Sequence, residues 1–248
     1  MNATNEGCFV PASILAHNGA PALAIRGQPV FPFLMMTSPE ALRELQAFGY
    51  EGSHLHTVET PLGWVGNARY DFSGFDKAIA DMTAADATAL IIPRIMISAP
   101  VEWMDTHPDD LVDYADPASW KDTGGWGGAR HPSWASATWR KEAGEALRQL
   151  LRHVPNSPAA GHIIGWHMCS GVYGEWHYPN PVYYPDTSKV FVAAYTRWLA
   201  RRYPTQTPPP RLPTIAERKT GRAGLFHDPV QDRWMMDHAE FLHLQGAE

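Results

Sequence analysis

The sequence has little cysteine, no run of positive charge and no long hydrophobic run. Its two cysteines, Cys8 and Cys169, are far apart and form no CxxC pair, so neither a zinc ribbon nor a disulfide framework is expected. Two free thiols fit a reducing compartment. The N-terminal residues include Glu6 and no lysine or arginine, and Pro11 interrupts their apolar run, which argues against a secretory signal. We therefore predict a cytoplasmic protein.

Further absences exclude several classes of partner. No stretch approaches the ~20 apolar residues that a membrane span needs. The formal net charge is -6 and no basic run occurs, so neither nucleic acid nor a membrane is an expected partner. No glycine-rich phosphate fingerprint follows the first strand, which argues against a dinucleotide, and we predict that the protein uses no cofactor.

What is present indicates one sizeable folded core. The chain has 248 residues, 44% of them hydrophobic and 19% charged, which is typical of a globular protein and long enough for an α/β barrel. Aromatic residues make up 11%, including ten tryptophans. Most of these rings are expected to fill the core, although tryptophan faces also stack well on sugars.

The order of predicted elements favours a parallel sheet. A hairpin is expected around 22–33, with its turn at 26–29, and further strands at 50–59, 88–98 and 162–170. Helical periodicity marks 71–86, 132–153, 188–203 and about 230–244. Another helix is expected from Ser38 as N-cap to Gly49 as its stop. This alternation indicates a single domain over 1–248 with crossover helices, either doubly wound or a barrel.

Five stretches together resemble the β-galactosidase-like (β/α)8 glycoside hydrolases. They are NGAPALAIRGQPVFPF, IIPRIMISAPVEWMDTHPDD, HPSWASATWRKEAGEALRQLLRHV, IIGWHMCSGVYGEWHY and LPTIAERKTGRAGLFHDPVQDRW. The resemblance implies a TIM-type barrel whose general acid/base lies at the end of the fourth strand, which corresponds to Glu175. Gly174 stands where the wider clan usually has asparagine, so a hydrogen bond from that asparagine to the sugar is not implied. Arg94 corresponds to a site arginine that orients a second carboxylate.

The candidate site residues gather at the carboxyl ends of the predicted strands, where α/β proteins bind ligands. An acid/base glutamate must stay protonated, and Tyr173 and Trp176 could supply an apolar wall for Glu175. A loop glutamate surrounded by solvent explains the same residue without catalysis. The other predicted substrate-binding residues are Glu59, Arg94, Trp103, Trp126, Tyr173 and Trp176.

Two alternatives stay open. His54 and His56 alternate along a strand, so both imidazoles could reach one metal ion, with His167 as a third ligand of a metal-dependent hydrolase. The chain could also be a carbohydrate-binding pseudoenzyme. In the favoured interpretation the partner is a carbohydrate substrate, such as a β-linked galactoside.

The resemblance implies eight strands, and only about four βα units are expected here. We therefore expect the N-terminal half of a barrel, truncated and doubtful as an enzyme by itself. A half-barrel exposes two sheet edges and apolar surface. Such a chain is expected to form a homodimer, to associate with the missing C-terminal half, or to be poorly soluble.

Overall fold

The computed structural model describes residues 9–38, 41–115, 130–171, 174–178, 185–205, 211–220, 228, 230 and 232–247. The chain divides into two compact units. Unit 1 comprises Met1–Ile97 and Ala143–Ser170, and unit 2 comprises Ser98–Glu142 and Gly171–Glu248. Two of the predicted substrate-binding residues, Trp126 and Tyr173, lie outside the described residues.

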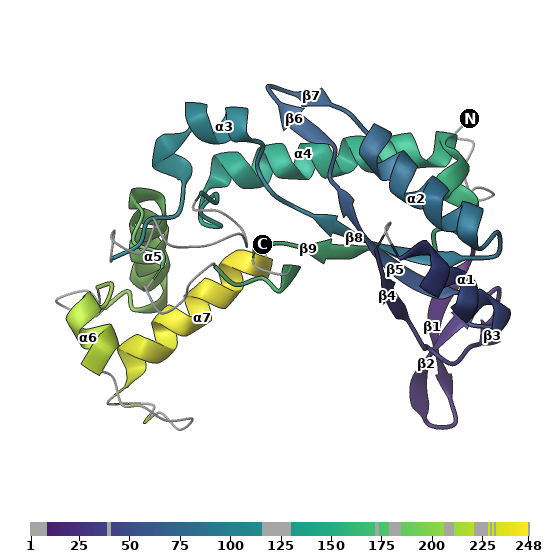
Figure 1. Ribbon diagram of the computed structural model, residues 1–248. Helices are drawn as coiled ribbons and strands as arrows, with labels where there is room; N and C mark the ends of the chain where they lie inside the picture. Colours follow the sequence, from purple (N-terminus) through teal and green to yellow (C-terminus); the bar gives the residue numbers. More distant parts are fainter. Residues whose placement is uncertain are drawn as a thin grey trace, which may run out of the picture. The chain divides into compact units, whose positions relative to one another are not determined.

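A four-stranded parallel sheet forms the centre of unit 1. Its strands are β4 (Met35–Thr37), β5 (Leu55–Pro61), β8 (Leu90–Met96) and β9 (His167–Cys169) (Figure 1). They lie in chain order, and every neighbouring pair is parallel. A doubly wound sheet reverses its strand order at a switch point, and no reversal occurs here. The expected parallel sheet is confirmed, and its sequential order is the order found in barrels.

The helices of unit 1 follow from amphipathic sequences between these strands. They are α1 (Leu42–Tyr50), α2 (Ser73–Ala85) and the second part of α4 (Ala137–His153). Helix α2 contacts both α1 and β5 and buries Phe75, Ile79 and Met82 (Figure 1). The ring of His153 lies 4.7 Å from that of Phe72, and its Nε2 lies 2.8 Å from Asp76 Oδ2, so α4 is fastened beside α2.

A small antiparallel sheet closes the amino ends of the parallel strands. It consists of β1 (Ala12–His17), β2 (Ala20–Ile25) and β3 (Gln28–Pro29). Val10 and Ile25 form one buried cluster with Leu55, the first residue of β5, and Leu90, the first residue of β8, packs against it. The hairpin expected around 22–33 is confirmed, and β1 is an additional strand. The small sheet thus covers the amino ends of β5 and β8 and leaves their carboxyl ends uncovered.

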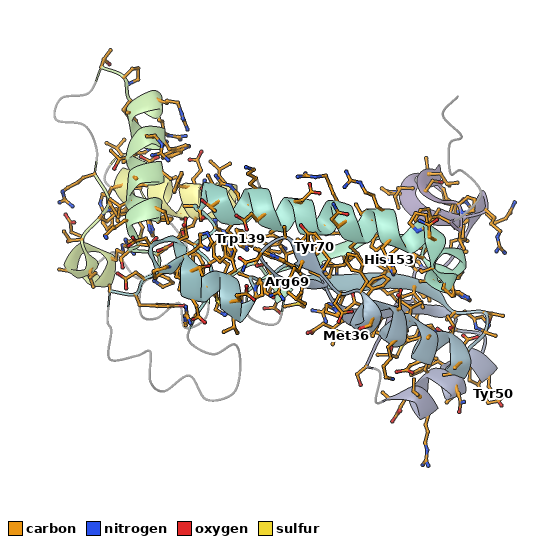
Figure 2. The ribbon with its side chains drawn as sticks, turned by 90° about the horizontal axis from the view of Figure 1, so that it is seen from above. Met36, Tyr50, Arg69, Tyr70, Trp139 and His153 are labelled. Carbon is orange, nitrogen blue, oxygen red and sulfur yellow. The ribbon has the colours of Figure 1, made fainter. Side chains whose placement is uncertain are left out.

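A second hairpin stands at the carboxyl end of β5. Its strands are β6 (Trp64–Gly66) and β7 (Arg69–Tyr70), joined through Asn67 and Ala68, which both have positive φ. Two central residues with positive φ are typical of a type I′ turn. Tyr70 stacks on Phe72 at 6.2 Å, and Phe72 stacks on His153 of α4. Figure 2 labels Tyr70 and His153. This hairpin was not expected from the sequence.

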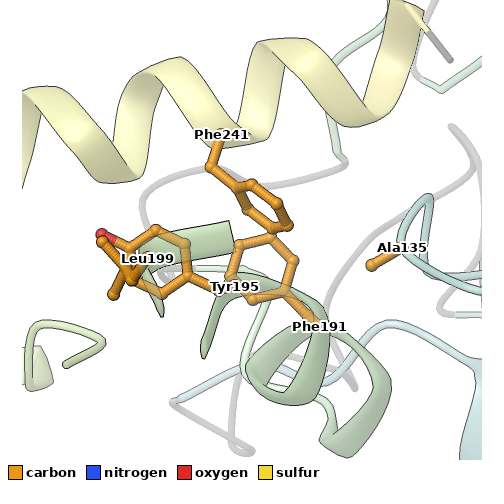
Figure 3. Packing of buried hydrophobic residues seen from close by; sticks show 5 residues of the cluster. All are labelled: Ala135, Phe191, Tyr195, Leu199 and Phe241. Atoms are coloured by element: carbon orange, nitrogen blue, oxygen red, sulfur yellow. The ribbon is translucent and has the colours of Figure 1, made fainter. Parts of the chain in front are cut away.

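Where the structure describes it, unit 2 consists of helices and irregular segments. The helical elements are α3 (Val101–Thr106), η1 (Pro108–Asp110), the start of α4, α5 (Lys189–Arg202), α6 (Ile215–Thr220) and α7 (Arg233–Ala247). Its core is a cluster of three aromatic rings, a leucine and an alanine, in which Phe191, Tyr195, Leu199 and Phe241 are at most 2% exposed (Figure 3). Ala135 completes the cluster. Two short 3-10 segments, η3 (Val154–Asn156) and η4 (Pro158–His162), follow α4 in unit 1.

Several element boundaries differ from the prediction. Helix α1 begins at Leu42 after Ala41 as N-cap, not after Ser38, and Gly49 lies inside it. The fourth strand was expected over 162–170, but β9 covers only His167–Cys169 after an isolated bridge at Ile163. Between the strand expected to end at 98 and the helix expected to begin at 132, where no element was predicted, the chain forms α3 and η1. Helix α5 begins as predicted, because the Ser188 hydroxyl caps it by accepting from the Phe191 N–H.

No helix among the described residues is both long and apolar enough to pass through a membrane.

Candidate active site

The two faces of the parallel sheet carry different side chains. Val58, Ile91 and Ile95 alternate onto one face and are fully buried. The other face carries Glu59, which lies opposite Arg94 in the ladder, and Arg94 in turn lies opposite His167. Residues paired across a ladder project to the same side, so these three side chains line one row across β5, β8 and β9. Polar and charged groups therefore mark this face near the carboxyl ends.

Arg94 is the centre of this row. Its Nη1 lies 3.0 Å from the sulfur of Met36 in β4, which is 71% exposed (Figure 2). On its other side it donates a hydrogen bond to Cys169 of β9. Burial raises the pKa of the Cys169 thiol, the Arg94 charge opposes that rise and the Glu59 charge adds to it. The guanidinium thus lies close to groups from three different strands.

Of the residues predicted on this face, the structure brings Glu59 and Arg94 together. Glu59 is exposed, and β5 continues past it to Pro61. Met36 and Cys169 were not predicted as site residues. The alternation of side chains along β4 and along β9 could have indicated them. In the strand register both lie on the face that carries Arg94, next to the row of charged side chains.

Glu175 follows β9 in a tight turn within unit 2. Gly171 has a φ of 73°, and a Cβ at this position would overlap the backbone carbonyl of His177, so only glycine permits this close approach. Gly174 and Trp176 also have positive φ, of 78° and 55°. The turn is therefore held by backbone geometry on both sides of the carboxylate, and the tryptophan conformation is one that large residues rarely adopt.

The Glu175 side chain is 64% exposed. One carboxylate oxygen lies 3.3 Å from Nε2 of His177, whose side chain is 42% exposed. Trp176 was expected to form an apolar wall beside Glu175. Its ring instead packs toward Trp134, with 5.8 Å between the two ring centres. Glu175 is thus an accessible acid with a histidine neighbour.

The other rings of this segment belong to a buried network. Trp134 stacks on Tyr178 at 4.2 Å, and its backbone N–H donates to the Tyr178 hydroxyl at 2.8 Å. Asp186 accepts from the N–H of Ser188 at 2.8 Å and from that of Asp113 at 3.3 Å. Burial, followed by the Asp186 charge, raises the pKa of Tyr178. These contacts hold the part of the chain that follows Glu175.

Trp103 was predicted as a sugar platform, and the structure places it in the core. Its ring is 1% exposed, stacks on His107 at 4.4 Å and donates from Nε1 to Glu142 at 3.0 Å. Stacking on a sugar requires an open ring face. The burial of Trp103 therefore favours a structural role.

The predicted metal set is not assembled. His54 and His56 both approach Asp86, with Nδ1 of His54 at 2.7 Å and Nε2 of His56 at 3.7 Å from Oδ2. His167 lies on the opposite face, since it pairs with Arg94 whereas His56 pairs with Ile91. Within the described ranges no group of three histidine, cysteine or acidic side chains could hold a metal ion. Burial lowers the pKa of His56, so it is a neutral core histidine.

Comparisons with known proteins give one family. The model of glycoside hydrolase family 42, described as beta-galactosidase, matches residues 66–209, more than half of the chain. Among 21 matching chains of solved structures is a beta-galactosidase from the psychrophilic Marinomonas ef1, with a TM-score of 0.47 and 18% identity. The match covers 69% of this chain and 25% of that one, so the chain corresponds to about a quarter of that protein. No curated protein sequence matched the chain.

Proposed function

Because the chain belongs to the beta-galactosidase family of glycoside hydrolases, family 42, we propose that it contributes to hydrolysis of O-glycosidic bonds in a β-galactoside or a similar glycan. The observation that carries this proposal is the sequential parallel sheet, whose last strand leads through Gly171 to Glu175. Ligand sites of such sheets lie at the carboxyl ends of the strands. The family match spans both β8 and this turn.

Glu175 acts as the general acid/base in this proposal. Glycoside hydrolysis needs one carboxylic acid that protonates the leaving oxygen and a second carboxylate that acts as nucleophile or base. An acid must be reachable by the glycosidic oxygen, and the exposure of Glu175 fits that requirement. His177 at 3.3 Å orients the carboxylate. A substrate that covers the turn would remove water from the carboxyl group and favour its protonated form.

Arg94 and Glu59 take the role of substrate-binding groups. A guanidinium offers several donors in a fixed plane, which suits sugar hydroxyls or a second carboxylate. The contact with Met36 on one side and Cys169 on the other holds Arg94 in place. Trp176 remains a candidate for packing against a sugar, whereas Trp103 does not.

The parallel sheet supplies four strands of a (β/α)8 barrel in this proposal. In the part of the chain that the structure describes, β4 and β9 each pair on one side only. Met36 is largely exposed on the face that in a barrel points inward. The remaining strands would come from a further segment or from a second molecule. Size-exclusion chromatography tests this, because a stable monomer of this chain would contradict the expected association.

The acid/base role is tested with aryl β-galactosides of different leaving groups. We expect Glu175→Gln to slow hydrolysis of a phenyl galactoside about 10²- to 10⁴-fold, because a poor leaving group requires protonation. A dinitrophenyl galactoside should be affected far less. Both this chain and a chain extended through its natural downstream reading frame should be assayed.

Glu44→Gln is the matched control, since Glu44 is an exposed glutamate of α1. Its rate should equal that of the unmodified chain, and circular dichroism should show that both variants are folded. An unchanged rate of Glu175→Gln on the phenyl galactoside would exclude Glu175 as the acid. Saturable sugar binding without product, in both lengths of chain, would support a binding module in place of an enzyme.

A further inference from the structure

Unit 2 contains a groove that the proposed acid/base chemistry does not use. It has a volume of about 330 Å³ and lies among α4, α5 and α7. Arg140, Arg197 and Arg201 line it together with Trp198, Phe241 and Gln245. None of the described lining residues is acidic. Three guanidinium groups thus meet in one groove of a chain whose net charge is -6.

Helix α5 directs two of these arginines to the same side. Arg197 and Arg201 are four residues apart, so they are neighbours on one helical face. Like charges at this spacing destabilise a helix, unless an anion lies between them. Both side chains are exposed, and among the described residues neither has an ion pair.

The neighbouring arginine on the same helix is paired. Arg202 lies 3.3 Å from Asp237 and 2.9 Å from Glu240, both of α7. Asp237 also lies 3.0 Å from Arg233. The acidic side chains of α7 therefore form ion pairs with arginines outside the groove. The positive charges of Arg197 and Arg201 are left to interact with a ligand.

The third guanidinium is held in position. Nη1 of Arg140 donates to the backbone carbonyl of Trp134 at 2.8 Å and to Oε1 of Gln245 at 2.9 Å. Gln245 is only 6% exposed, so it provides a fixed support. A guanidinium whose orientation is set in advance loses less entropy when it binds an anion.

An aromatic wall stands beside the basic side chains. The rings of Trp198 and Phe241 lie 5.6 Å apart, and Phe241 packs on Tyr195 at 5.2 Å in the core of unit 2 (Figure 3). Arg202 covers the Trp198 ring at 4.8 Å, which fixes that ring further. The groove thus places donors that suit carboxylate, sulfate or phosphate oxygens beside a fixed indole ring.

We propose that this groove binds an acidic sugar, whose carboxylate or sulfate group is held by Arg197, Arg201 and Arg140. Trp198, which is only partly buried, is the ring of this wall that a sugar can reach, whereas Phe241 is 2% exposed and supports it from the core. The assignment to a sugar rests on the proposed function, whereas the assignment to an anion rests on the groove alone. The site would bind charged glycans apart from the Glu175 turn.

The test is a calorimetric titration at low ionic strength, because salt screens exposed charges. The probes are galacturonate, galactose 6-sulfate, neutral galactose and inorganic sulfate. We expect both acidic sugars to bind more tightly than galactose and more tightly than inorganic sulfate. The double variant R197Q/R201Q should bind acidic sugars at least about tenfold more weakly, which corresponds to about 1.4 kcal/mol. If the double variant does not fold, the single variants R197Q and R201Q are titrated in its place.

R26Q/R43Q is the matched control, since it removes the same charge at two exposed positions of unit 1. R26Q/R43Q should bind the acidic sugars as tightly as the unmodified chain does. E175Q should also bind them as tightly, and because it should lose hydrolysis, it separates this site from the proposed function. Equal affinity in R197Q/R201Q, or galactose binding as tightly as the acidic sugars, would overturn the anion site. Acidic sugars no tighter than inorganic sulfate would overturn the sugar assignment.

Discussion

The two units are held together by different interactions. In unit 1 the backbone ladders of β4, β5, β8 and β9 fix the positions of the side chains, and apolar residues fill one face. In unit 2 buried polar side chains connect segments far apart in the chain, and Asp186 alone joins residues of three segments through Asp113, Tyr178 and Ser188. Removal of one side chain leaves the backbone hydrogen bonds of a ladder in place, whereas removal of one carboxylate from such a network breaks several hydrogen bonds at once.

This difference also separates the proposed site residues. Glu59 and Arg94 are placed by strand register, whereas Glu175 is placed by a glycine turn and its neighbouring network. Eight of the ten tryptophans lie in unit 2, because only Trp64 and Trp166 fall within unit 1. Tryptophan fluorescence therefore reports mainly on unit 2, and circular dichroism reports on both units.

The largest expected effect concerns the apolar face of unit 1. Ile95 is fully buried, so Ile95→Ala should lower the free energy of unfolding by about 3 kcal/mol through lost burial and a cavity. Met36→Ala, on the opposite face, should cost about 0.5 kcal/mol or less. Urea unfolding followed by circular dichroism measures both. Equal effects of the two variants would show that the open face is covered in solution.

A smaller effect is expected from the network of unit 2. Asp186→Ala leaves the buried N–H of Ser188 and the Tyr178 hydroxyl without their acceptor, at a cost of about 2 kcal/mol. Asp186→Asn keeps an acceptor oxygen and should lose less. Urea unfolding followed by tryptophan fluorescence is the measurement, with the exposed Asp109→Ala as control. If Asp186→Ala unfolds like the control, the network does not hold this segment.

The smallest effect, counted for each pH unit, concerns a buried histidine. Burial, followed by the charge of Arg218, lowers the pKa of His238 to about 3. The unfolded chain therefore binds a proton near pH 6.5 that the folded chain does not bind, and stability falls as pH falls from 6.5 toward 3. The expected loss is roughly 1 kcal/mol per pH unit.

His238→Gln removes this proton uptake and should flatten that part of the stability profile. His243→Gln, at an exposed position of the same helix, should leave it unchanged. Fluorescence-monitored unfolding between pH 4 and pH 7 compares the three chains. Parallel profiles for all three would mean that His238 is reached by solvent.

The sequence allowed prediction of the parts that repeat regularly. The apolar run of β8 and the stripe of α5 appear at the expected positions, because burial of one face or both leaves a periodic pattern. Ser188 was recognisable as a helix start because its hydroxyl caps the first turn. The boundaries of α1 and β9 were wrong, since local tertiary contacts override cap and strand preferences.

The site could be predicted only in part. The pairing of Glu59 with Arg94 depends on ladder register, which the sequence does not reveal without the sheet. The burial of Trp103 depends on Glu142 and His107, and nothing around the tryptophan distinguishes a core ring from an exposed one. The connection of Asp113 to Asp186 spans more than seventy positions and leaves no local pattern.

The contact between Gly171 and the His177 carbonyl has a practical meaning for protein design. These two positions are natural anchor points for grafting, because the backbone crosses itself there and leaves no space for a methyl group. A donor loop that retains glycine at the first anchor and an unobstructed carbonyl at the second can carry new side chains between them. Libraries built on this scaffold should therefore hold both anchors constant and randomise the interval.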